Sequence, residues 1–232
     1  MAVAFNVASN TKGTATSSLT WAHTCTGTNM LLWVGVGSGA NTAHLTSSVT
    51  YNAVAMTAEL FDLASGITHC SGHYLKNPDT GGAFNIIATL AAADDEMIVG
   101  AMSYTDVDQT TPVGTPNSAS STTVNITSAT GELVVDAQYT ADWTAPQNHA
   151  ATGGQTERVN VTDSGDAFGF LGMSEHAGAA SVTMSWTTDA TGHQIGGVSL
   201  KPVAASTPDM PGQYAMFPKA TMRQPLTAGR TN

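Results

Sequence analysis

Charged side chains are scarce in this sequence: Asp, Glu, Lys and Arg together make up 10% of its 232 residues. A globular domain usually contains about 25% of them. Aromatic residues are also few, at 6%. Ser, Thr, Asn, Ala and Gly take the place of both classes. A polar but uncharged surface of this kind is typical of exposed β-proteins that work as parts of assemblies.

Long apolar runs are missing as well. No stretch approaches the roughly 20 apolar residues of a membrane-spanning helix, so the sequence predicts no membrane association. The N-terminal segment MAVAFNVASNTKG lacks the basic start and the apolar run of a signal peptide. We therefore expect a protein that is made and assembled in a cytosol.

The charge that is present is unevenly distributed. The net charge is −10, and residues 1–200 hold 16 of the 17 acidic residues against three bases, Lys12, Lys76 and Arg158. Residues 201–232 instead carry four bases and one acid. An acidic β-surface repels nucleic acid and anionic membranes, so neither is an expected partner. A basic segment on an acidic body predicts that this segment binds an acidic protein surface.

The dominant pattern is an alternating segment, a turn and a second apolar run. It is clearest in residues 122–139, where TTVNIT, SATG and ELVVDAQY follow one another. Period-two alternation beside turn residues predicts two antiparallel strands joined as a hairpin. The pattern recurs at 19–36, 84–104 and 181–200. Because the four pairs are unevenly spaced, they predict a two-layered β-structure rather than a solenoid.

The segments between these pairs predict further strands and polar loops. Residues 10–18 are rich in turn formers and predict a linker. Residues 48–57 predict a hairpin with Asn52-Ala53 at its tip, since Asn tolerates the left-handed backbone that such a turn needs. A short helical turn over residues 56–64 is the best helix candidate.

Together these segments predict an all-β fold, with roughly ten to twelve strands in a single jelly-roll-like β-sandwich. The sandwich is expected to cover residues 1–200. At Lys201 the alternation stops, and residues 201–232 contain five of the nine prolines. A segment without hydrophobic periodicity cannot fold alone, so it predicts an extended C-terminal arm.

Five stretches, in this order, resemble a group of β-sandwich domains found in structural proteins of tailed phages and in bacterial prophage regions. They are LTWAHTCTGTNMLLWVGV, SVTYNAVAMT, YLKNPDTG, IVGAMSYTDVDQTTPVGT and ATGELVVDA, and they span residues 19–137. The segment HQIGGVSLKP extends the resemblance to residue 202. Members of the group usually have Asn-Gly where this chain has Asn52-Ala53. The resemblance implies a structural role in a virion and carries over no catalytic residues.

Seven histidines and two cysteines raise a metal hypothesis. His23 and Cys25 share one strand face, and His69 and His73 share another, with Cys70 on the opposite side. A zinc site needs about four converging ligands at tighter spacing than this. A disulfide between Cys25 and Cys70 is an alternative that a cytosol disfavours. We therefore expect Cys25 to be a small buried hydrophobic residue, and we expect no metal or other cofactor.

Acidic residues cluster at 94–96, 106–108 and 163–166. Oxygen-rich loops can bind calcium, but none of these has the order of an EF-hand loop, so we expect solvated turns. No G-x-S-x-G motif occurs, and the GVGSG of residues 35–39 has no helix after it to form a nucleotide loop. The paired carboxylates of a glycosidase stay open, because only a three-dimensional structure shows their separation. The expectation is that the protein is not an enzyme.

The arm carries apolar residues interspersed with prolines and bases. We expect it to insert between neighbouring subunits, where the apolar side chains become buried and the bases meet acidic surface. The alternative is a tether that wraps its own domain. The arm residues expected to bind a partner are Tyr214, Met216, Phe217, Lys219, Met222, Arg223 and Arg230.

These observations predict a structural protein of the virion, assembled in the cytoplasm of a bacterial host. The best expectation is a capsid decoration (cement) protein. Its expected partners are the major capsid protein and copies of itself, in a homotrimer by analogy with such proteins. The alternative is a tail-fibre or adhesin domain that binds a glycan, with Trp143 as the candidate contact. A carbohydrate-processing enzyme ranks last.

Overall fold

The computed structural model describes residues 2–39, 45–141, 149–162, 169–190 and 192–204 of the chain. Over these ranges the protein is an all-β sandwich of packed sheets, which confirms the predicted fold class. The helical turn predicted for residues 56–64 is wrong, because β5 occupies this segment. In the part of the chain described, no helix is long and apolar enough to cross a membrane.

The strands follow one another along the chain with short connections. Their bounds are β1 (Ala4–Thr24), β2 (Leu31–Gly39), β3 (Thr46–Tyr51), β4 (Val54–Ala55), β5 (Thr57–Ser65), β6 (Thr68–Lys76), β7 (Ala83–Thr105), β8 (Asn117–Ala119), β9 (Thr123–Thr127), β10 (Leu133–Ala141), β11 (Ala150–Ala151), β12 (Thr156–Thr162), β13 (Gly169–Ala177), β14 (Ser181–Thr187) and β15 (Gly192–Leu200).

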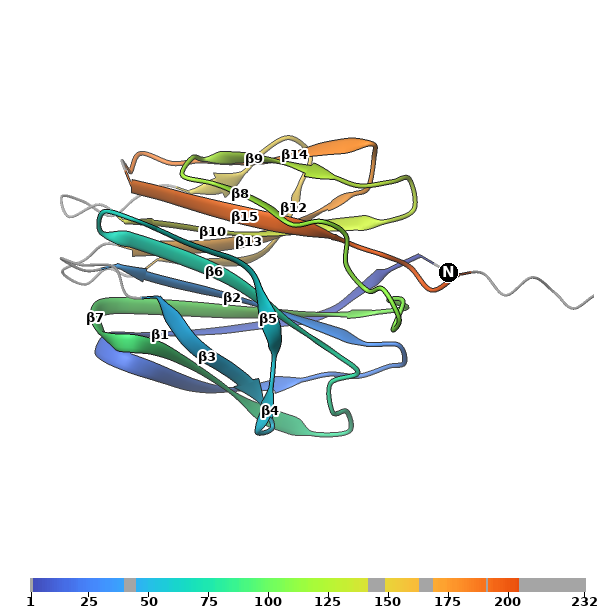
Figure 1. Cartoon of the computed structure of the whole chain (residues 1–232), viewed down its shortest axis with the longest axis horizontal. Coiled ribbons are helices and arrows are strands. Elements are labelled where there is room, and N and C mark those ends of the chain that lie inside the picture. The colour runs from blue at the N-terminus through green and yellow to red at the C-terminus, as the bar shows by residue number, and fades with distance from the viewer. Residues whose placement is uncertain (1, 40–44, 142–148, 163–168, 191, 205–232) are drawn as a thin grey trace, which may run out of the picture.

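These strands form four layers, which are stacked from bottom to top in Figure 1. The two-layered arrangement predicted from the sequence is therefore wrong, because three separate cores lie between the layers. The lowest, here called the basal layer, contains β3, β4 and the parts of β1 and β7 that pair at residues 18–24 and 83–89. The first central sheet contains β2, β5, β6 and the remaining parts of β1 and β7. The second central sheet contains β8, β10, β12, β13 and β15. The top layer contains β9, β11 and β14.

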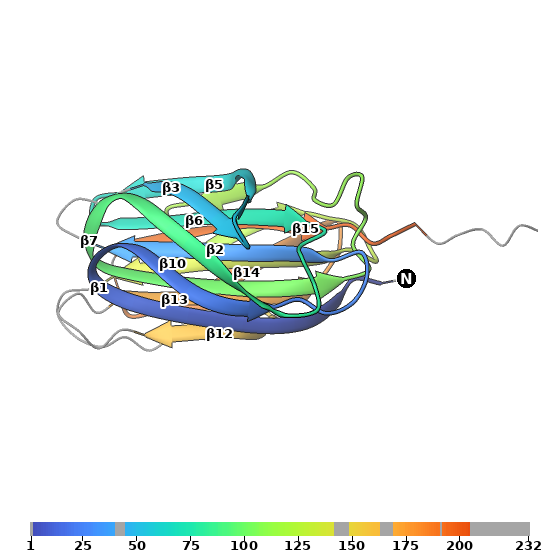
Figure 2. The same ribbon diagram turned by 90° about the horizontal axis from the view of Figure 1, so that it is seen from below.

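The basal layer continues directly into the first central sheet because β1 and β7 bend together. Ala15 has a φ of 50°, and the register of β1 against β7 shifts just after it. The two ends of β1 therefore face each other, and Ser9 Oγ lies 2.7 Å from His23 Nδ1. Figure 2 looks onto the basal layer from below, where β1 and β7 curve in front of the central strands. The linker predicted at residues 10–18 is wrong, since these residues belong to β1.

Three hydrophobic cores fill the spaces between the four layers. Ile86 of the basal layer and Val34 of β2 belong to the lowest core. The central core, between the two central sheets, is built around Trp33 and Tyr139. Trp186 of β14 lies in the third core, below the top layer. Each central sheet is therefore covered on both faces, and β2 is buried at every residue.

The sequence pattern of a strand depends on whether one or both of its faces are covered. Strands covered on both faces have near-continuous apolar runs, such as LLWVGVG in β2 and LVVDAQY in β10. In the outer strands β9 and β14, buried residues alternate with residues that are exposed or half-buried. A near-continuous apolar run therefore indicates a strand of an internal layer, and alternation indicates a strand of an outer layer.

Within the described residues, none of the four pairs predicted from the repeated pattern forms a hairpin of adjacent strands. Residues 84–104 lie within one continuous strand, β7. The other three pairs, at 19–36, 122–139 and 181–200, connect strands of different layers across a shared core. Alternation predicts a strand and its buried face, but it does not identify the partner strand. A short turn between two apolar faces joins stacked layers as readily as neighbouring strands.

The hairpin predicted at residues 48–57 is confirmed. β3 pairs with β4 so that Tyr51 lies opposite Val54, and only Asn52 and Ala53 separate them. Both turn residues have positive φ, 46° and 63°, as a type I′ turn requires. Ala53 is the less favourable of the two, because its Cβ crowds the backbone in this conformation.

Replacing Ala53 by glycine is expected to stabilise the protein by about 1 kcal/mol, because glycine adopts positive φ without this crowding. Urea unfolding of both proteins measures the difference. The control is Ala55→Gly in β4, which is expected to lower stability by roughly 0.5–1 kcal/mol. An Ala53→Gly variant no more stable than the parent protein would contradict the prediction.

Candidate functional site

The residues singled out from the sequence as partner contacts lie outside the described residues, so their roles stay predictions. This applies to Trp143 and to the arm residues Tyr214, Met216, Phe217, Lys219, Met222, Arg223 and Arg230. The structure does describe the point from which the arm leaves the sandwich. This point, residues 201–203, is here called the arm root.

Backbone hydrogen bonds fix the arm root to the loop that follows β7. The Lys201 N–H donates to Pro112 O at 2.9 Å, and Lys201 O accepts from the Asp108 N–H at 2.8 Å. Two residues further along the chain, the Val203 N–H donates to Asp106 O at 2.8 Å. The chain is therefore held as an extended strand for three residues beyond the end of β15.

The arm root continues β15, which is an internal strand of the second central sheet. β15 pairs with β10 along nine residue pairs, from Gly192 to Leu200, and with β8 on its other side. Val198 and Leu200 are completely buried in the central core. In Figure 1, β15 runs toward the end of the molecule where the N-terminus also lies.

A cavity of about 190 Å³ opens beside the arm root, and most of its wall is apolar. Two of its residues are oppositely charged, Glu132 and Lys201, and four others carry a hydroxyl group. Glu132 Oε2 accepts hydrogen bonds from Ser128 Oγ at 3.2 Å and from the Ala129 N–H at 3.1 Å. The residues around the cavity are Gly114, Thr115, Thr127, Ser128, Ala129, Glu132, Ser199 and Lys201.

Asp106 and Asp108 lie half-buried in the loop that holds the arm root, consistent with the turn expected at residues 106–108. Asp108 Oδ1 accepts from the Thr110 N–H at 2.7 Å and from the Thr111 N–H at 3.1 Å. These two backbone donors lower the pKa of Asp108. The carboxylate therefore stabilises the loop against which Lys201 is bonded.

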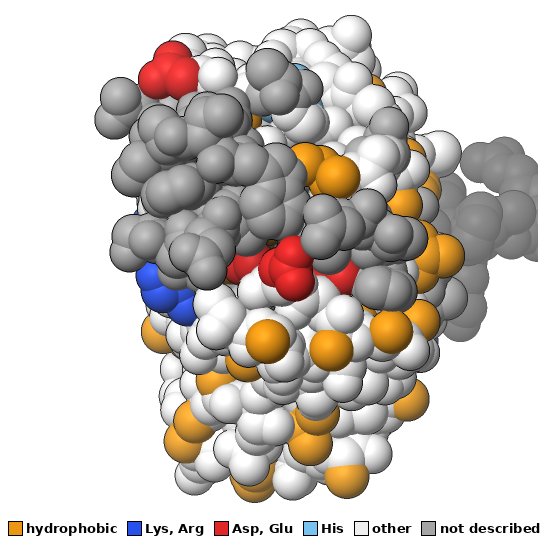
Figure 3. All heavy atoms as spheres, turned by 90° about the vertical axis from the view of Figure 1, so that its left-hand side faces the viewer, with side chains coloured by type: hydrophobic (Ala, Val, Ile, Leu, Met, Phe, Trp, Pro, Cys, Tyr) orange, Lys and Arg blue, Asp and Glu red, His pale blue; other side chains and the backbone are white. Residues whose placement is uncertain are grey.

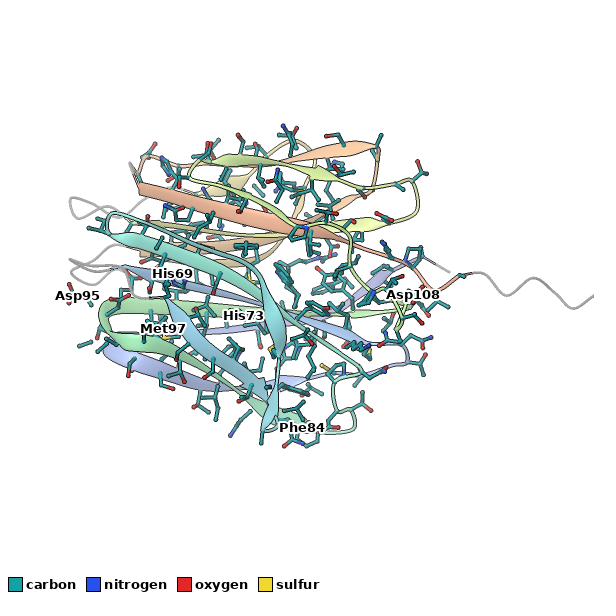
Figure 4. All side chains as sticks on the ribbon, viewed as in Figure 1. His69, His73, Phe84, Asp95, Met97 and Asp108 are labelled. Carbon is teal, nitrogen blue, oxygen red and sulfur yellow. The ribbon has the colours of Figure 1, made fainter. Side chains whose placement is uncertain are left out.

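The acidic cluster at residues 94–96 is not the solvated turn that the sequence predicts. Asp94 and Glu96 are 2% and 0% exposed within β7, and only Asp95 points to solvent. Glu96 Oε2 accepts a hydrogen bond of 2.7 Å from the Gly169 N–H. Figure 4 places Asp95 at the end opposite Asp108, and Figure 3, which views this end, shows acidic side chains near its middle. The cluster at 163–166 lies outside the described residues.

The cysteines occupy separate cores. Cys25 is free and fully buried in the lowest core, which confirms its expected role as a small hydrophobic residue. Cys70 is free in the central core, where its thiol donates to Ala137 O at 3.7 Å. No disulfide joins them. Among the described residues, no three His, Cys, Asp or Glu side chains lie together as metal ligands would.

The histidine side chains of β6 face the lowest core, opposite Cys70 as predicted. His69 Nδ1 lies 3.4 Å from Ser38 Oγ, and His73 Nε2 lies 3.0 Å from Ser71 Oγ. His23 reaches the same interior from the basal layer, and burial lowers its pKa to about 4. The rings of His69 and His73 therefore lie within hydrogen-bond distance of hydroxyl groups inside the lowest core.

The chain matches no protein-family model, no curated protein and no solved structure. The resemblance to β-sandwich domains of phage structural proteins therefore rests on the quoted sequence stretches.

The sequence analysis did not identify two groups of ionisable side chains, the buried Asp136 and a partly buried ion pair. Asp136 interrupts the apolar run LVVDAQY, and that interruption is the signal that marks it. Its Oδ1 accepts from the N–H and the Oγ of Ser174, both at 2.8 Å, and its Oδ2 accepts from Trp186 Nε1 at 2.8 Å. Burial nevertheless raises the pKa of Asp136 to about 7.

The second group is an ion pair at the edge of the two central sheets. The Arg158 guanidinium donates to Glu175 Oε1, and its Cζ lies 3.9 Å from the ring centroid of Phe5. Phe5 packs edge-on against Tyr104 at 5.9 Å. β1 and β7 are thereby joined to β12 and β13. No sequence spacing indicates this contact, because its members are brought together only by the stacking of the sheets.

Proposed function

We propose that this chain is a structural protein of a phage particle, a capsid decoration protein whose C-terminal arm holds it to neighbouring subunits. The observation that supports this best is the continuity of the arm root with β15. An arm that transmits force needs an attachment point that does not peel away. The structure provides such an attachment in a strand bonded on both sides.

The geometry of β15 favours resistance to a pull along the arm. The hydrogen bonds between antiparallel strands lie perpendicular to the strand direction. A force along β15 therefore loads the nine residue pairs with β10 together rather than one after another. The arm root adds its bonds to Pro112, Asp108 and Asp106 in the same direction. A flexible tag on a binding domain would not need this arrangement.

The charge distribution supports contact between the arm and another protein chain. Residues 201–232 carry four bases, whereas residues 1–200 carry 16 acids and three bases. Opposite charges speed up encounter and select the partner. The partners proposed are the major capsid protein and further copies of this chain, arranged as a homotrimer.

Removing residues 205–232 is expected to abolish retention on the particle while leaving the sandwich folded, because the arm root remains in place. Quantitative mass spectrometry of purified particles gives the copy number relative to the shell protein. We expect hundreds of copies of the full chain at a fixed ratio, and at least about tenfold fewer of the truncated chain, since a lost tether lowers effective concentration. The melting temperature of the truncated protein checks its folding.

Two outcomes would contradict this function. Equal retention of full and truncated chains would show that the arm does not hold the protein. A few copies per particle would instead place the protein in the tail and favour glycan binding, the alternative function. A variant with Lys219, Arg223 and Arg230 changed to glutamine separates the charge of the arm from its apolar contacts.

A further inference from the structure

We infer that the outer face of the basal layer is a packing surface for a second copy of this chain. The inference rests on the proposed function, in which many copies lie side by side and are held by their arms. This packing would be a contact between the sandwich domains of two copies, in addition to the contact made by the arm. The surface is here called the basal face.

The basal face consists of the outward-pointing residues of β1, β3 and β7 in the basal layer. Along each strand they alternate with residues that point into the lowest core. Trp21 and Ile86 are buried there, so the alternate positions on the same strands point outward. Ile87 is 39% exposed at the centre of this face. Its direct neighbours in register are Thr20 on β1 and Thr50 on β3. Thr24, Ala22, Ser18, Ala83, Asn85, Thr89 and Ser48 complete the surface.

The basal face carries no ionised side chain. Residues 13–58 and 80–93, which supply all of its strands, contain no Asp, Glu, Lys or Arg. His23 is the one titratable imidazole of these strands, and it is buried with a pKa lowered to about 4. The face is therefore neutral on a protein whose net charge is −10.

Exposed large hydrophobic residues concentrate on the same layer. Four such residues occur in the described chain, and two of them, Leu45 and Ile87, lie on or directly beside β3 and β7 of the basal layer. A third, Val54 of β4, lies opposite the buried Tyr51 and therefore on the inner side of the same layer. The neighbours of Ile87 are short, so a second sheet can approach to about 10 Å, the usual spacing of packed sheets.

The top layer offers a matched surface with a different composition. On β9 and β14 its outward residues are hydroxyl and amide side chains, and Ala150 of β11 adds a small one, so the described part of this face carries no large apolar group. Thr183 Oγ1, for example, donates to Asn125 Oδ1 at 2.6 Å. The top face is also free of charge, but it is hydrated rather than apolar, so it serves as the control.

The absence of charge selects a second copy as the occupant. Two acidic bodies repel each other wherever their carboxylates meet, whereas two basal faces meet without any like charges. A partner of opposite charge gains nothing from this surface. Three strands about 4.8 Å apart and seven residues at about 3.3 Å give only about 300 Å² of flat area per copy. Stable complexes bury about 800 Å² per partner, so this contact needs the high local concentration that the arms provide.

The test compares Ile87→Lys on the basal face with Thr123→Lys on the top face, both in the full chain. Sedimentation equilibrium at increasing protein concentration measures self-association. We expect Ile87→Lys to weaken association at least about tenfold, because lysine ammonium groups would face each other in the contact. Thr123→Lys is expected to change it less than about twofold. Equal effects of the two variants, or no association of the parent protein, would overturn the inference.

A covalent readout locates the contact directly. Ile87→Cys and Thr123→Cys each add one exposed thiol, since Cys25 and Cys70 are buried. A short bismaleimide cross-linker is expected to give a dimer from Ile87→Cys and little from Thr123→Cys. Equal yields would overturn the inference. The copy number on particles and its dependence on residues 205–232 decide the proposed function separately, so the two can fail independently.

Discussion

Replacing Gly37 by alanine is expected to destabilise the fold by about 3 kcal/mol, the upper range for overpacking a core. Gly37 lies in β2, on the face toward the central core. A Cβ at this position would stand 2.7 Å from Tyr139 Cγ and 2.9 Å from Tyr139 Cβ, and closer still to Cδ2. The tyrosine cannot retreat, because β10 is bonded on both sides and covered on its other face.

A double-mutant cycle shows whether the cost comes from this contact. Tyr139→Ala alone should cost about 3–5 kcal/mol, because it leaves a cavity in the central core. The double variant should be less destabilised than the sum of the two by at least about 1 kcal/mol, since the new methyl group then enters that cavity. Chemical denaturation of the four proteins measures the coupling. Additive losses would contradict the proposed packing of Tyr139 on Gly37.

Gly37 also shows why the sequence predicts the fold class but not the stacking. The runs of β2 and β10 have the composition of strands, and both strands exist. That they face each other across the central core depends on the match of Gly35 and Gly37 to Ala137 and Tyr139. Such a match between residues about 100 positions apart leaves no signal in local periodicity.

The predicted turns show the same limit. At residues 48–57 the turn residues require positive φ, so the local sequence specifies the hairpin by itself, and it is confirmed. At 122–139 the turn is compatible with a hairpin and with a connection between layers. Burial of both Ile126 and Val134 in the third core decides for the connection between layers. A hairpin prediction is therefore correct where the turn residues alone determine the backbone conformation. It is wrong where burial in a core determines how the two strands are arranged.

The candidate site was predictable only in part. Loss of periodicity at Lys201 marks where the arm begins, because a change of composition is visible in sequence alone. The bonds of the arm root to Asp106 and Asp108 depend on tertiary structure. The neutral basal face is a long uncharged stretch in the sequence, but only the bend of β1 and β7 brings its parts together.

Asp136 is expected to make stability fall as the pH rises from about 4 to about 7. Its pKa rises from 3.8 in the unfolded chain to about 7 in the folded protein, because burial disfavours the charged carboxylate. Between these values the folded state binds more protons than the unfolded state, so raising the pH removes stability. The carboxylic acid is the stable form in the fold up to about pH 7. Above it, a buried charge must be held by Ser174 and Trp186 alone.

Two histidines change the pH dependence of stability in the opposite direction over nearly the same pH range. Burial lowers the pKa of His23 and of His149 to about 4, below their ordinary value of 6.5. The unfolded state then binds the extra protons, and their contribution to stability rises with pH. The pH profile of the parent protein alone therefore does not isolate Asp136. The difference between the parent protein and Asp136→Asn does, because both proteins share the histidines.

The unfolding free energy of the parent protein minus that of Asp136→Asn is expected to fall by on the order of 4 kcal/mol between pH 4 and pH 8, since each pKa unit corresponds to about 1.4 kcal/mol. Asparagine still accepts from Ser174, but its NH2 group faces the Trp186 N–H, which adds a cost that is independent of pH. That offset shifts the whole difference curve and leaves its slope unchanged. Urea unfolding at pH 4.5, 6 and 8 measures the slope, and a constant difference would show that Asp136 is ionised throughout. A falling difference would mean instead that the third core holds a protonated acid up to about pH 7, and that the contribution of Asp136 to stability decreases as the solution changes from acidic to neutral.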